Sequence, residues 1–149
     1  MQSDTAQHSN TVQVEILWGD CDPAGIVFYP NYFRMFNAAT DSLFASAGLS
    51  LTHLQEEHGI IGYPMIDARA MFLSPNRFGE AITILTRAIG WGRSSFEIEH
   101  VVHNTAGRSI EAYEKRVWGA LDGSGKLVGR TIPDVVRKRL GHTPVDGAR

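Results

Sequence analysis

The sequence of 149 residues predicts an α+β domain in which one antiparallel sheet packs against one long helix. Three patterns lead to this prediction. Residues 11–18 alternate apolar and polar side chains, as a half-buried strand does. Residues 30–47 repeat apolar side chains at steps of three and four, the period of an amphipathic helix. Residues 63–121 are rich in Ile, Val, Phe and Thr, and turn residues divide them into four candidate strands.

Proline and glycine mark where these elements begin and end. Pro30 fits the first helical position, because its fixed φ suits a helix and the N–H it lacks needs no partner there. Gly48 suits the residue just after the helix. The turns at Gly92-Arg93 and 105–107 fit hairpins, so we expect the four later strands to form an antiparallel meander. The remaining expected elements are strands at 63–74, 81–91, 94–103 and 109–121, and short helices at 51–58 and from Pro133 onward.

The chain length suits a single domain, which we place at residues 11–142. We expect a disordered N-terminal tail at residues 1–10 and a C-terminal tail at 143–149. One sheet covered by one long helix leaves an edge and an open face exposed, and pairing between subunits is the common remedy. The sequence therefore also predicts a homo-oligomer.

Composition excludes several classes of partner. With 14 basic against 16 acidic residues, the chain has no broad basic surface for nucleic acid. No apolar run approaches the ~20 residues of a membrane span, so we expect no membrane partner. The first residues lack the apolar core of a signal peptide, and the single cysteine excludes an internal disulfide. These features predict a cytoplasmic protein.

The most informative segment is residues 19–32, which read GDCDPAGIVFYPNY. It places Asp22 in a Pro/Gly-rich loop that leads directly into the helix beginning at Pro30. The first N–H groups of a helix are unpaired, and the helix dipole adds positive charge there. Such donors can hold the oxyanion that forms when a carbonyl is attacked. The alternative is structural, because an Asp ahead of Pro23 is also a common Asx-turn.

Neighbouring polar residues offer weaker alternatives. Asp20 lies two residues before Asp22 and could share its site, although local hydrogen bonding is the simpler interpretation. Cys21 is flanked by both carboxylates, which disfavour a thiolate, so we interpret it as structural. His100 and His103 would face opposite sides of a regular strand and cannot chelate one ion. We expect no metal and no cofactor.

The segment from Asp22 to Tyr32 resembles the 4-hydroxybenzoyl-CoA thioesterase family. The shared pattern is an acid, a small Pro/Ala/Gly turn, an apolar pair, a tyrosine and Asn-Tyr. The similarity continues through residues 59–64 and 91–96 and covers most of 12–140. The resemblance implies the hot-dog fold, in which an antiparallel sheet of five or six strands wraps around one long central helix.

The resemblance also implies an activity, which is hydrolysis of acyl-CoA thioesters without metal or cofactor. Members of the family are usually dimers of dimers, with active sites across a dimer interface. By resemblance, Asp22 acts as nucleophile or as general base, and the sequence leaves these two routes open. The backbone N–H of Tyr29, at the helix start, would donate to the oxyanion.

The resemblance further assigns binding residues, namely Phe28, Asn37 and Gly62 for the acyl group and Arg93, Ser94 and Arg130 for coenzyme A. Two departures from the namesake branch concern these residues. Asn37 stands where that branch has an aspartate, and an amide carries no charge. As a structural alternative, Asn37 is a polar residue at the border of the apolar helix stripe. After Trp91, the namesake branch has a run of basic residues, and this chain keeps only Arg93.

The sequence thus predicts a thioesterase for an aromatic, hydroxybenzoyl-CoA-like substrate. Pro30 supports the aromatic branch, because the fatty-acyl branch typically has histidine at that position. Alternatives are a short- or medium-chain acyl-CoA thioesterase, a hot-dog dehydratase and an acyl-CoA-binding protein. The dehydratases generally use a histidine–carboxylate pair, and no histidine lies near Asp22 in the sequence.

Overall fold

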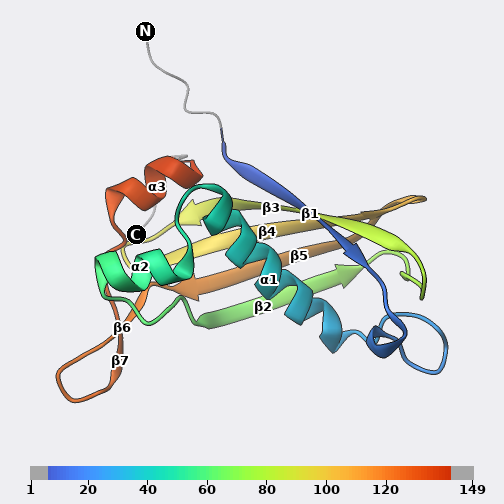
Figure 1. Cartoon of the computed structure of the whole chain (residues 1–149), viewed down its shortest axis with the longest axis horizontal. Coiled ribbons are helices and arrows are strands. Elements are labelled where there is room, and N and C mark those ends of the chain that lie inside the picture. The colour runs from blue at the N-terminus through green and yellow to red at the C-terminus, as the bar shows by residue number, and fades with distance from the viewer. Residues whose placement is uncertain (1–6, 142–149) are drawn as a thin grey trace, which may run out of the picture.

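A computed structural model describes residues 7–141, in which a five-stranded antiparallel sheet lies against helix α1 (Figure 1). A two-stranded hairpin, two short α-helices and a single 3₁₀ turn (Trp18–Asp20) complete the described part of the chain. The elements are β1 (Ser9–Glu15), α1 (Pro30–Ser46), α2 (Leu51–His58), β2 (Met65–Phe72), β3 (Ala81–Trp91), β4 (Ser95–Asn104), β5 (Gly107–Val117), β6 (Gly119–Leu121), β7 (Leu127–Gly129) and α3 (Asp134–Leu140). The predicted α+β class and the number of sheet strands are confirmed.

The strand order of the large sheet is β1-β3-β4-β5-β2, with every neighbouring pair antiparallel. Strands β3, β4 and β5 form the expected meander, but β2 pairs with β5, so the predicted four-strand meander is wrong at its first strand. The connection after β2 does not form a hairpin, because it docks on the 19–29 loop. There the N–H of Val27 donates to Asn76 O at 3.0 Å and that of Phe78 to Gly25 O at 3.1 Å.

The core lies between α1 and the covered face of the sheet. The predicted apolar stripe of the helix is buried, from Tyr32 near its start to Phe44 near its end. Inward side chains of the sheet, such as Ile84, Ile98 and Ile110, meet this stripe and are fully buried. Burying one such side chain contributes roughly 1.5–3 kcal/mol, so this contact holds α1 across the strands.

Several predicted boundaries agree with the structure, and others need correction. Helix α1 begins at Pro30, and Gly59 ends α2 with φ at +67°, a conformation that favours glycine. Strand β1 begins at Ser9, which pairs with Arg87, so the predicted tail of residues 1–10 is too long. The predicted strand 109–121 is divided into β5 and β6, and β7 was not predicted. The predicted tail 143–149 lies outside the described residues.

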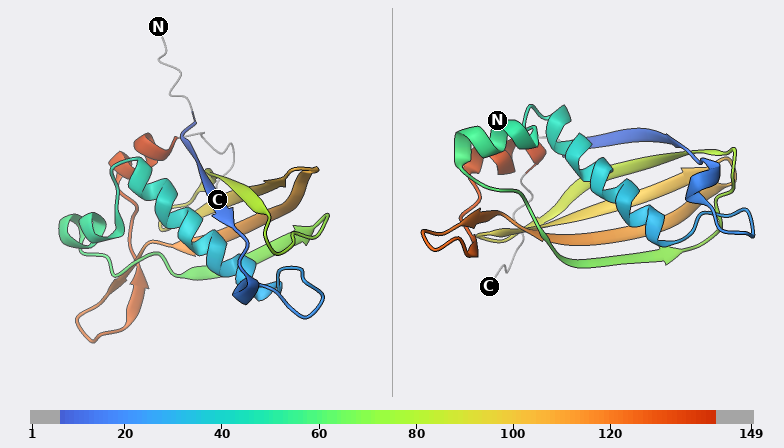
Figure 2. Two further views of the ribbon diagram at one scale, coloured as in Figure 1. Left: turned by 45° about the vertical axis from the view of Figure 1, so that its right-hand side comes forward. Right: turned by 60° about the horizontal axis from the view of Figure 1, so that its bottom comes forward.

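Two ends of the molecule matter for function. The loop after β1 lies at one end of α1, whereas α2, α3 and the β6–β7 hairpin gather at the other (Figures 1 and 2). The 17 residues of α1 separate these ends by about 26 Å at 1.5 Å per residue. No helix within residues 7–141 is long and apolar enough to cross a membrane.

Candidate active site

Asp20 is a structural residue of the 19–29 loop. Its carboxylate is buried, with Oδ2 accepting the Leu17 N–H at 2.9 Å and Oδ1 paired with Arg34 Nη2 at 2.7 Å. The carbonyl of Asp20 also accepts hydrogen bonds from the Phe28 N–H and the Asn31 side chain, which joins the two ends of the loop. Both carboxylate oxygens are therefore occupied, and Asp20 does not share a site with Asp22.

Asp22 lies in an Asx-turn, as the structural interpretation predicted. Its Oδ1 accepts the Ala24 N–H at 2.8 Å, and its own N–H donates to Ile26 O at 2.9 Å. The side chain is nevertheless half-buried, and Oδ2 accepts no hydrogen bond from any residue in the described range 7–141. The turn thus fixes one oxygen of the carboxylate and leaves the other open.

The start of α1 offers one free backbone donor. Among residues 7–141, the Tyr29 N–H has no acceptor. The N–H groups of Asn31 and Tyr32 are paired with Phe28 O at 2.9 Å and Tyr29 O at 3.2 Å, and Pro30 has none. The expected cluster of unpaired amides is therefore reduced to a single N–H, which lies at the positive end of the helix dipole.

An apolar cavity of about 290 Å³ lies beside this helix start. It is lined by Tyr29 and Tyr32 of the helix end and by Phe72 and Asn76, and the Asn76 side chain donates to the Tyr32 hydroxyl at 2.9 Å. The ring of Phe28 is exposed next to Tyr29, with its centroid 5.6 Å from the tyrosine ring. Of the three predicted site residues near this end of α1, Tyr29 lines the cavity, whereas Asp22 and Phe28 do not.

A second cavity, of about 330 Å³, lies farther along α1 and contains two other predicted residues. Asn37 and Gly62 line it together with Asp41, Tyr63 and Arg116. Neither Asp22 nor Tyr29 lines this cavity. One chain therefore brings Asn37 and Gly62 together and keeps both apart from the carboxylate.

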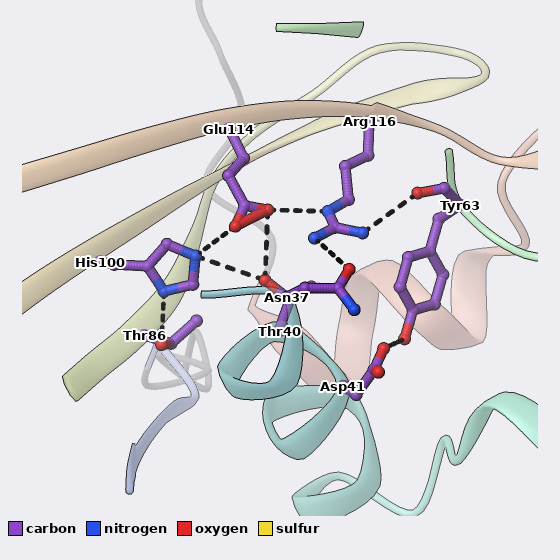
Figure 3. A network of polar contacts seen from close by, with 8 residues as sticks. All are labelled: Asn37, Thr40, Asp41, Tyr63, Thr86, His100, Glu114 and Arg116. Atoms are coloured by element: carbon purple, nitrogen blue, oxygen red, sulfur yellow. Dashed lines mark hydrogen bonds and ion pairs between the residues drawn. The ribbon is translucent and has the colours of Figure 1, made fainter. Parts of the chain in front are cut away.

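A row of polar side chains, buried except for the exposed Asn37 at its end, crosses the core next to this second cavity (Figure 3). Glu114 accepts from His100 Nε2 at 2.6 Å and from Arg116 Nε at 2.8 Å. The other ring nitrogen of His100 bonds the Thr86 hydroxyl at 2.8 Å. Arg116 continues the row, and its Nη2 donates to Asn37 Oδ1 at 3.1 Å. The row thus runs from β3 through β4 and β5 to α1.

The charges in this row compensate each other in the interior. Burial alone would raise the pKa of Glu114, but the hydrogen bonds and charges of His100 and Arg116 hold that pKa below its usual range. Glu114 is therefore ionised and pairs with the guanidinium of Arg116. Every buried side-chain nitrogen and oxygen of the described residues has a hydrogen-bond partner. The pair is thus satisfied, as a buried ion pair must be.

The sequence analysis missed this row, although one pattern could have revealed it. In the predicted strand 109–121, Glu114 and Arg116 occupy the same alternate positions as Ile110, Ala112 and Trp118. Two charged residues on the apolar face of a strand indicate either a buried ion pair or a functional site.

Tyr63 and Asp41 form a second polar pair in the same cavity. The phenol of Tyr63 donates to Asp41 Oδ1 at 2.5 Å. Burial, with the hydrogen bond to Asp41, raises the pKa of Tyr63 well above its usual range, so the hydroxyl stays protonated. Its ring is packed on Phe44 with centroids 4.8 Å apart. Sequence reasoning had assigned no function to either residue.

The three predicted coenzyme A residues lie together at the end opposite Asp22. Arg93, in the turn between β3 and β4, is exposed and donates to Thr131 Oγ1 at 3.1 Å. Strand β7 passes directly over Ser94, because a Cβ atom added to Gly129 of β7 would lie only 3.0 Å from Ser94 Oγ. Arg130 follows β7 and is exposed. Two cations and a hydroxyl therefore converge near the β6–β7 hairpin.

The surroundings of Cys21 disfavour a thiol nucleophile in this loop. Partial burial, followed by the charges of Asp20 and Asp22, raises the pKa of the Cys21 thiol, which disfavours the thiolate. Within the described range, no three His, Cys, Asp or Glu side chains are grouped as metal ligands.

Comparison with known proteins identifies the family. The model of the thioesterase-like superfamily matches residues 16–140. The 4-hydroxybenzoyl-CoA thioesterase of Pseudomonas sp. strain CBS-3 is 38% identical over 121 residues, which cover 77% of this chain and 86% of that enzyme.

Two solved structures share the architecture. An aspartate-to-asparagine variant of 4-hydroxybenzoyl-CoA thioesterase, complexed with 4-hydroxybenzoyl-CoA, matches with a TM-score of 0.83 and 34% identity over 90% of this chain and 99% of that one. A gentisyl-coenzyme A thioesterase matches with a TM-score of 0.74 and 28% identity over 88% and 98%. The chain therefore has the predicted hot-dog fold and belongs to the thioesterase-like superfamily.

Proposed function

We propose that this chain hydrolyses an aromatic acyl-CoA thioester, similar to hydroxybenzoyl-CoA, to the free acid and coenzyme A. The proposal is carried by the 19–29 loop of this thioesterase-family chain. In this loop Asp22 has an open carboxylate oxygen, and the Tyr29 N–H has no acceptor within residues 7–141. The relatives described above act on 4-hydroxybenzoyl and gentisyl thioesters, which supports an aromatic acyl group.

Two routes fit this pair of groups. In the first, an oxygen of Asp22 attacks the thioester carbonyl, the C–S bond breaks, and water hydrolyses the resulting anhydride. In the second, Asp22 removes a proton from the attacking water. The Tyr29 N–H donates to the carbonyl oxygen as it becomes negative in either route. Label found in Asp22 after a single turnover in ¹⁸O-labelled water would establish the anhydride route, because general-base catalysis places label only in the product acid.

A substrate screen tests the proposal. Release of free thiol is followed with 4-hydroxybenzoyl-, benzoyl-, phenylacetyl- and short fatty acyl-CoA. We expect the aryl thioesters to give the highest kcat/KM. A preference for fatty acyl-CoA would favour the short-chain alternative, whereas measurable binding without any thiol release would indicate an acyl-CoA-binding protein.

The dehydratase alternative has one observation in its favour, the His100–Glu114 pair. However, the pair is buried beneath α1, with His100 0% and Glu114 2% exposed, and neither residue lines a described cavity. Incubation with crotonyl-CoA decides this question, because hydration without thiol release would support the dehydratase.

Coenzyme A binding is proposed for Arg93, Ser94 and Arg130, which converge near the β6–β7 hairpin. Arginine is suited to phosphate because its guanidinium donates two parallel hydrogen bonds. In Arg93→Ala, the charged hydrogen bond to a phosphate of coenzyme A is lost, and KM should therefore rise about tenfold. The measurement compares KM for an aryl-CoA with KM for the matching pantetheine thioester, which lacks the phosphates. An equal increase for both thioesters would contradict phosphate binding.

A second copy of the chain is proposed to complete the site. The loop after β1, which contains Asp22, and the β6–β7 hairpin, near which the predicted coenzyme A residues lie, are at opposite ends of α1 (Figure 2), so one chain does not bring these residues together. Strand β2 is an edge strand, and it exposes large apolar side chains along its length, including Ile66 and Met71 at 56% and 61%. A second chain that paired antiparallel with this edge would cover these side chains. It would also place the Asp22 end of one chain beside the coenzyme A end of the other. The proposed assembly is a dimer of dimers in the cytoplasm.

Charge on the β2 edge should therefore disrupt both assembly and activity. For Ile66→Lys, we expect the main species to shift toward the 16.4 kDa monomer in light scattering, with a parallel loss of thiol release. Val135→Lys is the matched control, because Val135 is an exposed apolar residue of α3. A fully active monomer of the Ile66 variant would contradict a site shared between chains.

A further inference from the structure

We propose that Arg137 of α3 positions Arg93 for the phosphates of coenzyme A by holding the backbone of the turn between β3 and β4. The inference deepens the proposed function and depends on it. Arg137 Nη2 donates to Gly92 O at 2.7 Å and to Arg93 O at 3.2 Å. One guanidinium from the C-terminal helix therefore bridges two consecutive carbonyl groups of the turn that carries Arg93.

The conformation of this turn depends on that contact. The Gly92 N–H donates to Ser95 O at 2.7 Å, but no backbone N–H within residues 7–141 donates to Gly92 O in return. Arg137 supplies the missing donor. Glycine has wide conformational freedom, so the peptide group between Gly92 and Arg93 needs a contact from outside the turn to fix it. The orientation of this peptide group sets the direction in which the Arg93 side chain leaves the turn.

The core and the end of β3 hold Arg137 in place. Val136 and Leu140, on either side of it in α3, are fully buried. Trp91 Nε1 donates to Gly141 O at 3.0 Å, which joins the end of α3 to β3. The guanidinium of Arg137 also lies over the Trp91 ring, 5.8 Å from its centroid, at the range of a cation–π contact. Arg137 is therefore a fixed support for the turn.

The charges at this turn favour an anionic ligand. Within residues 7–141, neither Arg93 nor Arg137 forms an ion pair, whereas five other arginines do, namely Arg34, Arg69, Arg87, Arg108 and Arg116. The Arg93 side chain donates only to the neutral hydroxyl of Thr131, so its charge is free to pair with a phosphate. Arg137 is engaged by the backbone of the turn, and it acts on the phosphate through Arg93.

The test removes the hydrogen bonds of Arg137 and keeps an unbranched side chain over Trp91. In Arg137→Met, we expect KM for an aryl-CoA to rise about three- to tenfold with kcat unchanged, as for loss of one or two hydrogen bonds that contribute equally before and during the reaction. KM for the matching pantetheine thioester should stay at the wild-type value, because that compound lacks the phosphates. An equal rise for both thioesters would overturn the inference. Partial unfolding lowers the concentration of active enzyme and leaves both KM values unchanged.

Arg139→Met is the matched control. It removes the same charge from the same helix, and the Arg139 side chain contacts Gly48 O instead of the turn. KM for the aryl-CoA should stay at the wild-type value in this variant. A rise as large as that in Arg137→Met would attribute the effect to net charge and would contradict a positioning role.

A double-mutant cycle separates positioning from direct contact. If Arg137 acts through Arg93, then Arg137→Met should raise KM for the aryl-CoA little further once Arg93→Ala is present. Two effects that multiply would rule out the inference, because Arg137 would then act on the phosphates independently of Arg93.

A binding measurement separates this inference from failure of the proposed function. If no thioester is hydrolysed, the thioesterase proposal is wrong, and calorimetry with coenzyme A and with pantetheine tests the turn alone. Weaker binding of coenzyme A by Arg137→Met, with binding by Arg139→Met unchanged, supports the inference. It is overturned if the wild-type chain binds coenzyme A no more tightly than pantetheine, or if Arg137→Met binds coenzyme A as tightly as the wild type.

Discussion

Replacing Asp22 with asparagine should reduce kcat for aryl-CoA hydrolysis by roughly three orders of magnitude or more, with little change in binding of the thioester. The amide can keep the Asx-turn, because its oxygen still accepts the Ala24 N–H. It cannot act as a base or as a carboxylate nucleophile, and loss of such a group typically costs about 10²–10⁴-fold in rate. The measurement is single-turnover thiol release, together with the Kd of the CoA ester by calorimetry.

Asp122 provides the matched control for this substitution. It also accepts backbone hydrogen bonds in a turn, from the N–H groups of Ser124 at 2.8 Å and Lys126 at 3.0 Å. Asp122→Asn removes the same charge from the same kind of turn and should keep wild-type turnover. If Asp22→Asn retained more than about a tenth of the wild-type rate, the lost stabilisation would be below ~1.4 kcal/mol, and Asp22 would be neither nucleophile nor base.

Replacing Glu114 with alanine should lower the free energy of unfolding by about 3–5 kcal/mol. The substitution leaves Arg116 and His100 buried without their shared carboxylate, and an unpaired buried charge is strongly destabilising. Urea denaturation measures the change. Glu111→Ala on the same strand is the control, because its ion pair with Arg108 is exposed and should contribute little.

The effect of Glu114 on stability should depend on pH. The folded pKa of Glu114 is held below its ordinary value of 4.5, so its contribution is complete above about pH 5 and is lost as the pH falls through the folded pKa. The difference in unfolding free energy between wild type and Glu114→Gln should therefore be largest near neutrality and shrink toward pH 3. A difference that does not vary with pH would show that Glu114 is not ionised in the folded chain.

Much of the fold could be predicted because its information is local. The helix stripe of α1, the proline at its start and the glycine after α2 each depend on residues within one or two turns. The loop around Asp22 was likewise recognisable, since a carboxylate, a turn and a helix start follow each other within nine residues. The Asx-turn interpretation of Asp22 is confirmed, and the catalytic interpretation stays a prediction, because the turn uses only one oxygen of the carboxylate.

The position of β2 was not predictable in the same way. Its composition and the turn residues after it indicate a strand but do not specify which strand it pairs with. An eight-residue connection, 73–80, follows it, and this segment docks on the 19–29 loop rather than turning back as a hairpin. The choice of β5 as partner therefore depends on contacts between segments far apart in the sequence.

The sequence by itself determined most of the elements, the family and the loop that carries Asp22, because periodicity, turn residues and a contiguous motif are all properties of neighbouring residues. Only the tertiary structure placed Asp41 beside Tyr63 and Asn37 beside Arg116, pairs that are 22 and 79 residues apart. Side chains from α1, the segment before β2, and β5 converge there, because sheet pairing and helix packing bring distant segments together. The loop that carries Asp22 was therefore visible in the sequence, and the buried contacts around Tyr63 and Arg116 were not.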